Sequence, residues 1–305
     1  MKFIIDSALA GQRLDVALSG LVPEPRSQTQ KGIKAGRVKV NQKIAKANYR
    51  LRAGDTIRLE PLLSQRALRR QAPLPAVAVI KDAADYVVIN KPAGLLVHPA
   101  RGHNELTLVD WLLKHYPKIK TAGDDPTRPG IVHRLDREVS GLMVVAKTLA
   151  SWQDLKQQFQ ERAVVKEYQA LVYGAINNDG GEINFLLARS AQGGKMAARP
   201  LGQTGKAALT EYRVTKHFIN YTQLKLLIKT GRTHQIRAHL AAFGHPLVGD
   251  NLYGTKVTRA ANKKFNLGRI WLAATRLAFT DLAGAPQEFK IALPPELKEV
   301  LEKVK

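Results

Sequence analysis

The apolar residues near the start of the chain recur at the spacing of one helix face. They are Leu14, Ala17, Leu18 and Leu21. A second helix is expected to begin at Ser27, where Gln30 completes a capping-box pattern, and to end at Gly36. Short apolar alternations after Gly36 predict strands. Residues 1–60 are therefore expected to form a small α+β domain.

The remainder of the chain mixes strand and helix patterns without regular alternation between them. Strands are predicted at residues 85–90, 164–173, 209–216 and 223–229, and helices at residues 109–116 and 149–159. Residues 177–208 are rich in glycine and predict a hairpin or a loop excursion, and the prolines at 294–295 predict the start of a closing helix. This order predicts an α+β fold with a mostly antiparallel mixed sheet.

The domain boundary is expected in residues 61–75, PLLSQRALRRQAPLP. This stretch combines prolines and arginines without any acid, which is a typical linker composition. A large domain is then predicted over residues 76–305.

The charge of the chain is strongly positive. There are 48 Lys and Arg against 25 Asp and Glu, a formal net charge of +23 and a pI of about 10.2. A clustered excess of this size indicates a nucleic-acid partner. The lack of cysteine excludes disulfides and thiolate metal sites and fits a reducing cytoplasm. Neither a signal-peptide pattern nor an apolar run long enough to span a membrane is present in the sequence, so no membrane association is expected.

The segment GIVHRLDREVSGLMVVAK, residues 130–147, encloses a group of charges between two apolar runs. Asp136 lies between Arg134 and Arg137, just before a predicted strand. Positive neighbours favour the ionised carboxylate. An aspartate here could simply cap a turn, but an ionised carboxylate at the start of a buried strand is also a candidate nucleophile or base.

Residues 230–254 predict an anion site. Thr233 is expected to cap a helix on which His234 and Arg237 share one face. Arg232 and Arg237 near the helix start suit either a phosphate or the carboxylate of the preceding motif. The histidines of this segment lack the spacing and the acidic companions of a zinc site, so no metal is expected.

The segment KEYQALVYG, residues 166–174, places Tyr168 in a predicted strand. A core tyrosine is the ordinary interpretation. Next to a basic cleft, the ring could also stack on a base. The chain contains no dinucleotide-binding glycine motif, P-loop or GxSxG motif, so those chemistries are not predicted.

Taken together, the motifs resemble those of the RluA-type pseudouridine synthases. GIVHRLDREVSGLMVVAK resembles the catalytic motif of this family, although Val139 replaces the usual threonine. NKPAGLLVHPA, KEYQALVYG and TGRTHQIRAHLAAFGHPLVGDNLYG resemble its strand-and-turn, tyrosine and arginine motifs, in the same order. Residues 1–60 resemble the RNA-binding module shared by ribosomal small-subunit protein four and tyrosyl-tRNA synthetases. The resemblance covers nearly the whole chain.

The resemblance implies cofactor-free isomerisation of uridine to pseudouridine in structured RNA, with residues 76–305 as the catalytic domain. It implies that Asp136 is the essential aspartate and that Tyr168 stacks on the uracil. The arginine that pairs with Asp136 is then Arg237 or, failing that, Arg232. The sequence leaves open whether Asp136 attacks the sugar, attacks the base or stabilises a glycal-like intermediate.

The same motifs provide four candidates for substrate binding: His133, Arg134, Arg232 and Lys91. A uridine in folded RNA must be flipped out before an enzyme can reach its glycosidic bond. Arg134, adjacent to Asp136, is expected to fill the gap that the base leaves or to hold a phosphate.

Large-subunit ribosomal RNA is the expected substrate, because some tRNA-acting relatives lack the N-terminal module. A tRNA-directed synthase and a catalytically idle RNA-binding ribosome-assembly protein are the alternatives. The protein is expected to be a cytoplasmic monomer without cofactor or metal.

Overall fold

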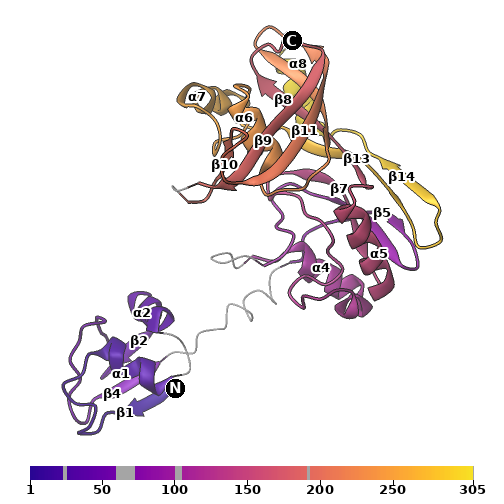
Figure 1. Ribbon diagram of the computed structural model, residues 1–305. Helices are drawn as coiled ribbons and strands as arrows, with labels where there is room; N and C mark the ends of the chain where they lie inside the picture. Colours follow the sequence, from indigo (N-terminus) through magenta and orange to yellow (C-terminus); the bar gives the residue numbers. More distant parts are fainter. Residues whose placement is uncertain (23–25, 60–72, 100–104, 191–192, 305) are drawn as a thin grey trace. The chain divides into compact units, whose positions relative to one another are not determined.

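The computed structural model describes residues 1–22, 26–59, 73–99, 105–190 and 193–304. The chain divides into two compact units, Met1–Pro73 and Leu74–Lys305 (Figure 1). The predicted linker, residues 61–75, lies outside the described residues except for its last three positions.

The small unit packs two helices on a four-stranded antiparallel sheet. Its elements are α1 (Leu14–Leu21), α2 (Arg26–Lys34), β1 (Lys2–Ile4), β2 (Val38–Val40), β3 (Lys43–Ile44) and β4 (Thr56–Leu59), and the strand order is β1-β4-β2-β3. The predicted apolar stripe is correct, since Leu14 and Leu18 are fully buried. The predicted cap is wrong, because α2 begins at Arg26 and Ser27 lies inside the helix. The helix ends before Gly36, whose φ of 72° suits glycine.

One ten-stranded sheet runs through the large unit (Figure 1). Its strands are β5 (Ala78–Asp82), β6 (Tyr86–Lys91), β7 (Ser140–Ala146), β8 (Val165–Tyr173), β9 (Gly180–Arg189), β10 (Met196–Arg199), β11 (Lys206–His217), β12 (Tyr221–Ile228), β13 (Leu272–Thr280) and β14 (Pro286–Lys290). The order is β10-β9-β11-β12-β8-β13-β7-β6-β5, with β14 also paired to β13. Among the described strands, every pairing is antiparallel except that of β7 with β13. The predicted fold class is confirmed.

The helices of the large unit lie beside both halves of this sheet. They are α4 (Leu108–His115), the 3-10 helix η1 (Pro117–Thr121), α5 (Leu149–Gln160), α6 (Gln235–Ala242), α7 (Lys256–Phe265) and α8 (Pro295–Lys303). Helix α5 packs against β7, whereas α6 packs against β9, β10 and β11 (Figure 1). The residue before α6 corrects one prediction: its N-cap is His234 in a left-handed conformation with φ 52°, not Thr233.

Strand β7 is the most deeply buried part of the sheet. All seven of its residues are buried, as expected for a strand covered on both faces. Gly141 has a φ of 130°, and a Cβ at this position would collide with the backbone of Ala274. This close approach occurs where β7 and β13 pair in parallel, directly after the loop that carries Asp136.

Candidate active site

Asp136 lies in the loop that leads into β7. Leu135 and Val139 on either side of it are buried in the main core. The Val139 N–H donates to the Asp136 carbonyl at 3.2 Å, so the chain turns back on itself here. The Asp136 side chain is only 14% exposed. Its carboxylate is therefore held between two buried neighbours with little access to water.

Lys91 supports this loop from within the protein. Its fully buried Nζ donates to the carbonyls of Pro92, Leu95 and Arg137 at 2.9, 2.8 and 3.3 Å. Burial lowers the pKa of Lys91 to about 7, and the positive charge of Arg269 adds to the shift. The three carbonyl acceptors oppose it, because only the ammonium form has three N–H groups. Lys91 thus joins β6 to the residue after Asp136.

Arg237 brings three carboxylates together around one buried guanidinium. The side chain is 4% exposed, and its Nε and Nη2 donate to the two oxygens of Asp250 at 2.7 and 3.0 Å. Its Nη1 lies 3.7 Å from Asp136 Oδ2 and 3.5 Å from Glu138 Oε2. Burial alone would lower the pKa of Arg237, but the hydrogen bonds and charge of Asp250, together with the charges of Asp136 and Glu138, outweigh it and raise the pKa. The bidentate pair with Asp250 fixes the guanidinium and turns Nη1 toward Asp136.

Tyr168 projects from β8 toward the same region. Its ring is buried in the main core, and its neighbours on that face of the strand are also buried. Burial raises the pKa of the Tyr168 phenol, and the negative charge of Asp136 raises it further. The phenol is therefore neutral at physiological pH, where it can donate a hydrogen bond as well as present its ring.

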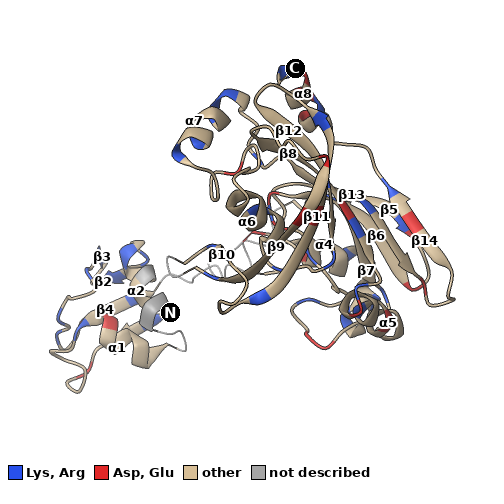
Figure 2. Cartoon of the chain, turned by 45° about the horizontal axis from the view of Figure 1, so that its top comes forward, with Lys and Arg blue, Asp and Glu red and all other residues tan. Residues whose placement is uncertain are grey.

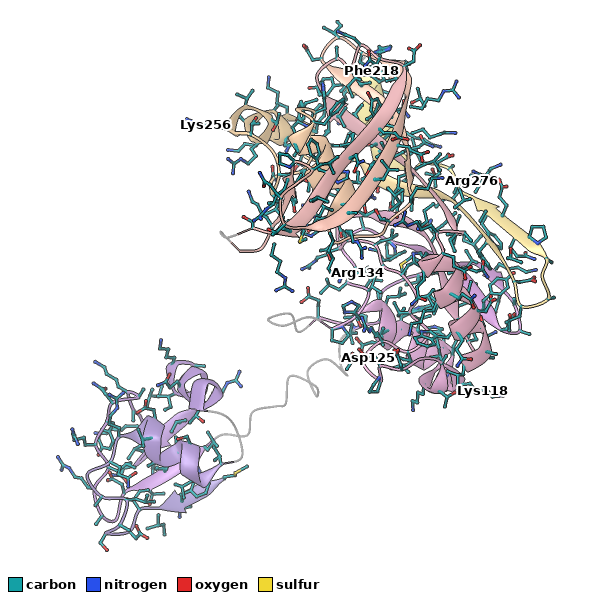
Figure 3. The ribbon with its side chains drawn as sticks, viewed as in Figure 1. Lys118, Asp125, Arg134, Phe218, Lys256 and Arg276 are labelled. Carbon is teal, nitrogen blue, oxygen red and sulfur yellow. The ribbon has the colours of Figure 1, made fainter. Side chains whose placement is uncertain are left out.

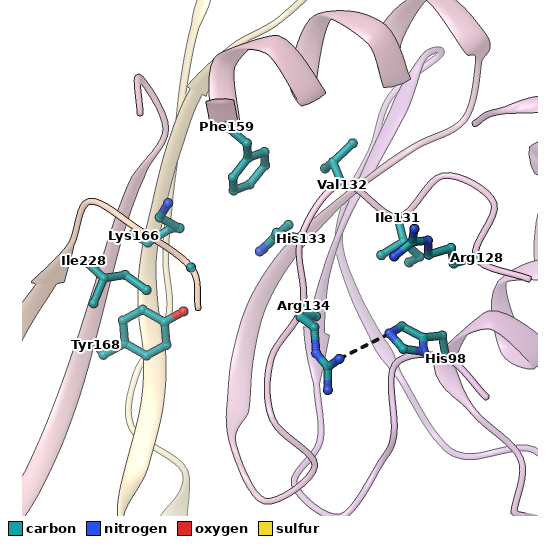
Figure 4. Close-up of a pocket in the computed structure, with 11 residues that line it drawn as sticks. His98, Arg128, Ile131, Val132, His133, Arg134, Phe159, Lys166, Tyr168 and Ile228 are labelled. Atoms are coloured by element: carbon teal, nitrogen blue, oxygen red, sulfur yellow. Dashed lines mark hydrogen bonds between the residues drawn. The ribbon is translucent and has the colours of Figure 1, made fainter. Parts of the chain in front are cut away.

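Tyr168 is shared by two adjoining cavities. A small one of about 50 Å³ contains Asp136, Arg232 and His234 in its lining. A larger one of about 280 Å³ has His133 and Lys166 in its wall, and both cavities share Arg134. Figure 4 shows the Tyr168 hydroxyl directed into the larger cavity, with Lys166 on one side and Arg134 on the other.

The remaining predicted site residues lie along these cavities. Arg134 is exposed (Figure 3). Its Nη1 lies 3.5 Å from Nε2 of His98 (Figure 4). Arg232 is exposed, and among the described residues no ion pair joins it to Asp136. His133 lines the larger cavity, but its Nε2 accepts a hydrogen bond from the Val144 N–H at 3.1 Å. Burial lowers the pKa of His133 to about 3, with a contribution from the charge of Lys166, so the ring is neutral.

Sequence reasoning missed two residues of this region. Asp250 is fully buried and holds Arg237, and it also accepts the N–H groups of Leu252 and Tyr253. Its place in a polar turn, GDNLYG, gave no sign of burial, although an acid within the arginine motif was a usable signal. Lys166 occupies the wall of the larger cavity two residues before Tyr168. Strand alternation places both side chains on one face of β8.

Neither a metal-binding cluster nor a membrane-spanning helix is present within the described ranges. In that part of the chain, no group of three or more His, Cys, Asp or Glu residues could hold a metal ion. The same residues contain no helix that is long and apolar enough to cross a membrane.

Comparison with known families agrees with this geometry. The family model described as RNA pseudouridylate synthase matches residues 85–242, and the S4 domain model matches residues 12–57. The matched ranges include Asp136, Tyr168 and Arg237. The chain belongs to the RNA pseudouridine synthase family, whose members are isomerases.

Individual relatives extend the similarity over almost the full chain. The chain is 38% identical to "Ribosomal large subunit pseudouridine synthase D" of Yersinia pestis, over 97% of this chain and 91% of that protein. It is 36% identical to the protein of the same name in Escherichia coli (strain K12), over 96% and 90%. Among solved structures, "Human RNA Pseudouridylate Synthase Domain Containing 1" matches with a TM-score of 0.60 and 25% identity, over 77% of this chain and 97% of that one.

Proposed function

We propose that this protein isomerises specific uridines of large-subunit ribosomal RNA to pseudouridine. The proposal rests on two contacts in a chain of this family: Arg237 pairs with Asp136, and Asp136 and Tyr168 line one cavity. The substrate assignment rests on relatives of nearly full-length similarity, whose names specify the ribosomal large subunit.

The reaction needs no external reagent. The bond between uracil N1 and the anomeric carbon breaks, the base turns, and its C5 bonds to the same carbon. C5 loses a proton and N1 gains one, so the product has the composition of the substrate. Asp136 acts at the reacting nucleoside, as nucleophile or as the stabiliser of an intermediate. Tyr168 stacks on the uracil and donates or relays a proton through its phenol.

Arg237 acts by positioning the carboxylate. Removing an aspartate from water favours its neutral form unless a cation compensates for the lost hydration. Arg237, held by Asp250, provides this charge at 3.7 Å. Arg134, exposed beside the cavities, is assigned to the space that the flipped nucleotide vacates or to a phosphate of the RNA.

The charge distribution supports an RNA substrate. The chain carries an excess of Lys and Arg, and the S4 match covers most of the small unit. Figure 2 shows Lys and Arg along α7, whose sequence KVTRAANKKF contains no acid. Such surfaces bind phosphates without reading sequence. We assign the protein to the cytoplasm, because it lacks cysteine and its relatives are named for the ribosomal large subunit. We also propose that it acts as a monomer.

The test is conversion of unmodified large-subunit ribosomal RNA transcripts by purified protein, read as pseudouridine at single-nucleotide resolution. Asp136→Asn should abolish conversion and leave RNA binding within about twofold, because its shape is kept and its charge is lost. Asp179→Asn is the matched control, since Asp179 is exposed and outside the cavities. Equal conversion by wild type and Asp136→Asn would refute the mechanism. Conversion of tRNA but not of ribosomal RNA would refute the substrate assignment.

A further inference from the structure

The larger cavity next to Tyr168 has several cations in its lining. Arg128, Arg134 and Lys166 contribute to its wall, and among the described lining residues there is no Asp or Glu. Arg128 is already paired, with Nε at 2.9 Å from Asp125. Among the described residues, neither Arg134 nor Lys166 forms an ion pair. The cavity therefore has two positive groups with no carboxylate to neutralise them.

Lys166 is the more unusual of these two cations because it is buried. It is 6% exposed, and its Nζ lies 5.1 Å from the centre of the Phe159 ring, which provides only a weak cation–π contact. Burial lowers the pKa of Lys166 to about 8, and the charge of Lys229 contributes, so the ammonium form still predominates near pH 7. A buried cation without a partner destabilises the free protein. This destabilisation is relieved when a ligand supplies the missing negative charge.

The position of Lys166 indicates which ligand this is. Lys166 and Tyr168 are two residues apart on one face of β8, about 7 Å along the strand. Figure 4 shows Lys166 above Tyr168 on the same side of the cavity, with Arg134 across from them. If the uracil stacks on Tyr168, the RNA strand that contains this uridine must continue past the Tyr168 ring. The backbone of that strand is the negatively charged part of the substrate.

We propose that the Lys166 ammonium binds a phosphodiester of the RNA strand next to the extruded uridine, opposite Arg134. This assignment rests on the proposed function, since it takes the strand to be that of the target uridine. Lys166 is a binding residue of the substrate cavity. The bound phosphate would offset the cost of burying the Lys166 charge, and it does so only when RNA is present.

The test compares Lys166→Met with Lys216→Met. Lys216 also lies over a phenylalanine ring, at 5.0 Å from Phe218, but it is exposed and outside the cavity. RNA affinity is measured at several salt concentrations in the Asp136→Asn background, so that the substrate is not consumed. Lys166→Met should weaken binding about tenfold and reduce the slope of log affinity against log salt by about 0.7, the value for one single-strand phosphate contact. Lys166→Arg should keep the slope, and Lys216→Met should change neither quantity.

The melting temperature of Lys166→Met without RNA distinguishes a role of Lys166 in RNA binding from a role in the stability of the fold. Lys166→Met should melt at the same temperature as the wild type or higher without RNA, because an unpaired buried charge is removed. An unchanged salt slope in the folded variant would overturn the proposal, whatever its melting temperature. If Lys166→Met does not fold, Lys166→Gln and single methylphosphonate linkages beside the target uridine replace it. One neutral linkage should then weaken binding to protein with Lys166 and not to Lys166→Gln, and equal losses would overturn the proposal.

The slope of log affinity against log salt concentration is a binding measurement and does not require the enzyme to convert any uridine. A wild-type protein that converts no uridine would contradict the proposed function, whereas the slope difference between Lys166→Met and Lys216→Met would still decide the phosphate contact.

Discussion

Two buried cations on either side of the Tyr168 region have opposite surroundings. Arg237 is within 4 Å of three carboxylates, whereas Lys166 has no ion-pair partner among the described residues. The first arrangement fixes the position of Asp136 before any RNA arrives. The second leaves charge free for a ligand. A buried charge can therefore serve preorganisation or recognition, depending on whether the protein itself neutralises it.

Among the substitutions around Arg237, removal of the Asp250 carboxylate should have the largest effect. Asp250→Ala removes both short hydrogen bonds to Arg237 and leaves a guanidinium buried without its main partner. The free energy of unfolding should fall by about 3–5 kcal/mol, measured by urea denaturation. Conversion by the folded fraction should fall about 100-fold, because Arg237 no longer holds Asp136 in place.

A surface pair is the control for Asp250. Arg276 donates to Glu288 at 3.1 and 3.3 Å, but both side chains are partly exposed. Glu288→Ala should therefore cost less than about 1 kcal/mol. If Asp250→Ala costs no more than Glu288→Ala, then Arg237 does not depend on Asp250 as described.

His133 lines the same cavity as Lys166. Because its ring is held neutral, it adds no further positive charge to the cavity. The pKa of His133 in the folded protein, about 3, is below its ordinary 6.5. Its contribution to stability is therefore complete above pH 6.5 and is lost as the pH falls toward 3. His133→Gln keeps an acceptor for the Val144 N–H without titrating. Wild type should lose stability on acidification more steeply than this variant, by up to about 1.4 kcal/mol per pH unit.

Urea denaturation at pH 7, 6, 5 and 4 measures this difference. All other ionisable groups are common to the two proteins, so the difference between their profiles reports on His133. Parallel profiles would mean that His133 is not held neutral in the folded state.

The smallest expected effect is at Glu138. Its carboxylate lies 3.5 Å from Arg237 and is 42% exposed, so water screens the interaction. Glu138→Gln should change the free energy of unfolding by less than about 1 kcal/mol and leave Asp136 paired. A loss as large as that of Asp250→Ala would mean that Glu138, rather than Asp250, neutralises Arg237.

Much of the fold was readable from local patterns. The strand predicted at residues 223–229 corresponds to β12, in which Leu224, Leu226 and Ile228 are buried on one face, and the stripe at Leu14 and Leu18 correctly predicted a helix. Helix α7 was missed, although Val257, Ala260, Ala261 and Phe265 recur in it at helical spacing. Its one buried residue is Asn262, which accepts hydrogen bonds from the Gly249 N–H and the Tyr173 hydroxyl, both at 2.7 Å. The N-cap of α6 was misassigned because a left-handed His234 has no signature in the sequence.

The candidate site divides in the same way. The sequence marked Asp136, Tyr168 and Arg237 through the residues next to them. It could not separate Arg232 from Arg237, because their distances to Asp136 depend on how α6 packs on the sheet. It also placed Lys91 among the substrate-binding candidates, whereas the structure directs its Nζ to three backbone carbonyls.

By itself, the sequence determined the family, the α+β class, the positive charge and the identity of the ionisable groups, because periodicity and composition are local properties. The tertiary structure alone decided which charges are neutralised. Asp250 is 13 residues from Arg237 in the sequence and Asp136 is about 100 residues away. Only the folded sheet brings these carboxylates to one guanidinium, and within the described part of the chain it leaves Lys166 without an acidic partner. Electrostatic energy depends on distance and burial, and neither can be read from local patterns along the chain, because both depend on how distant segments pack.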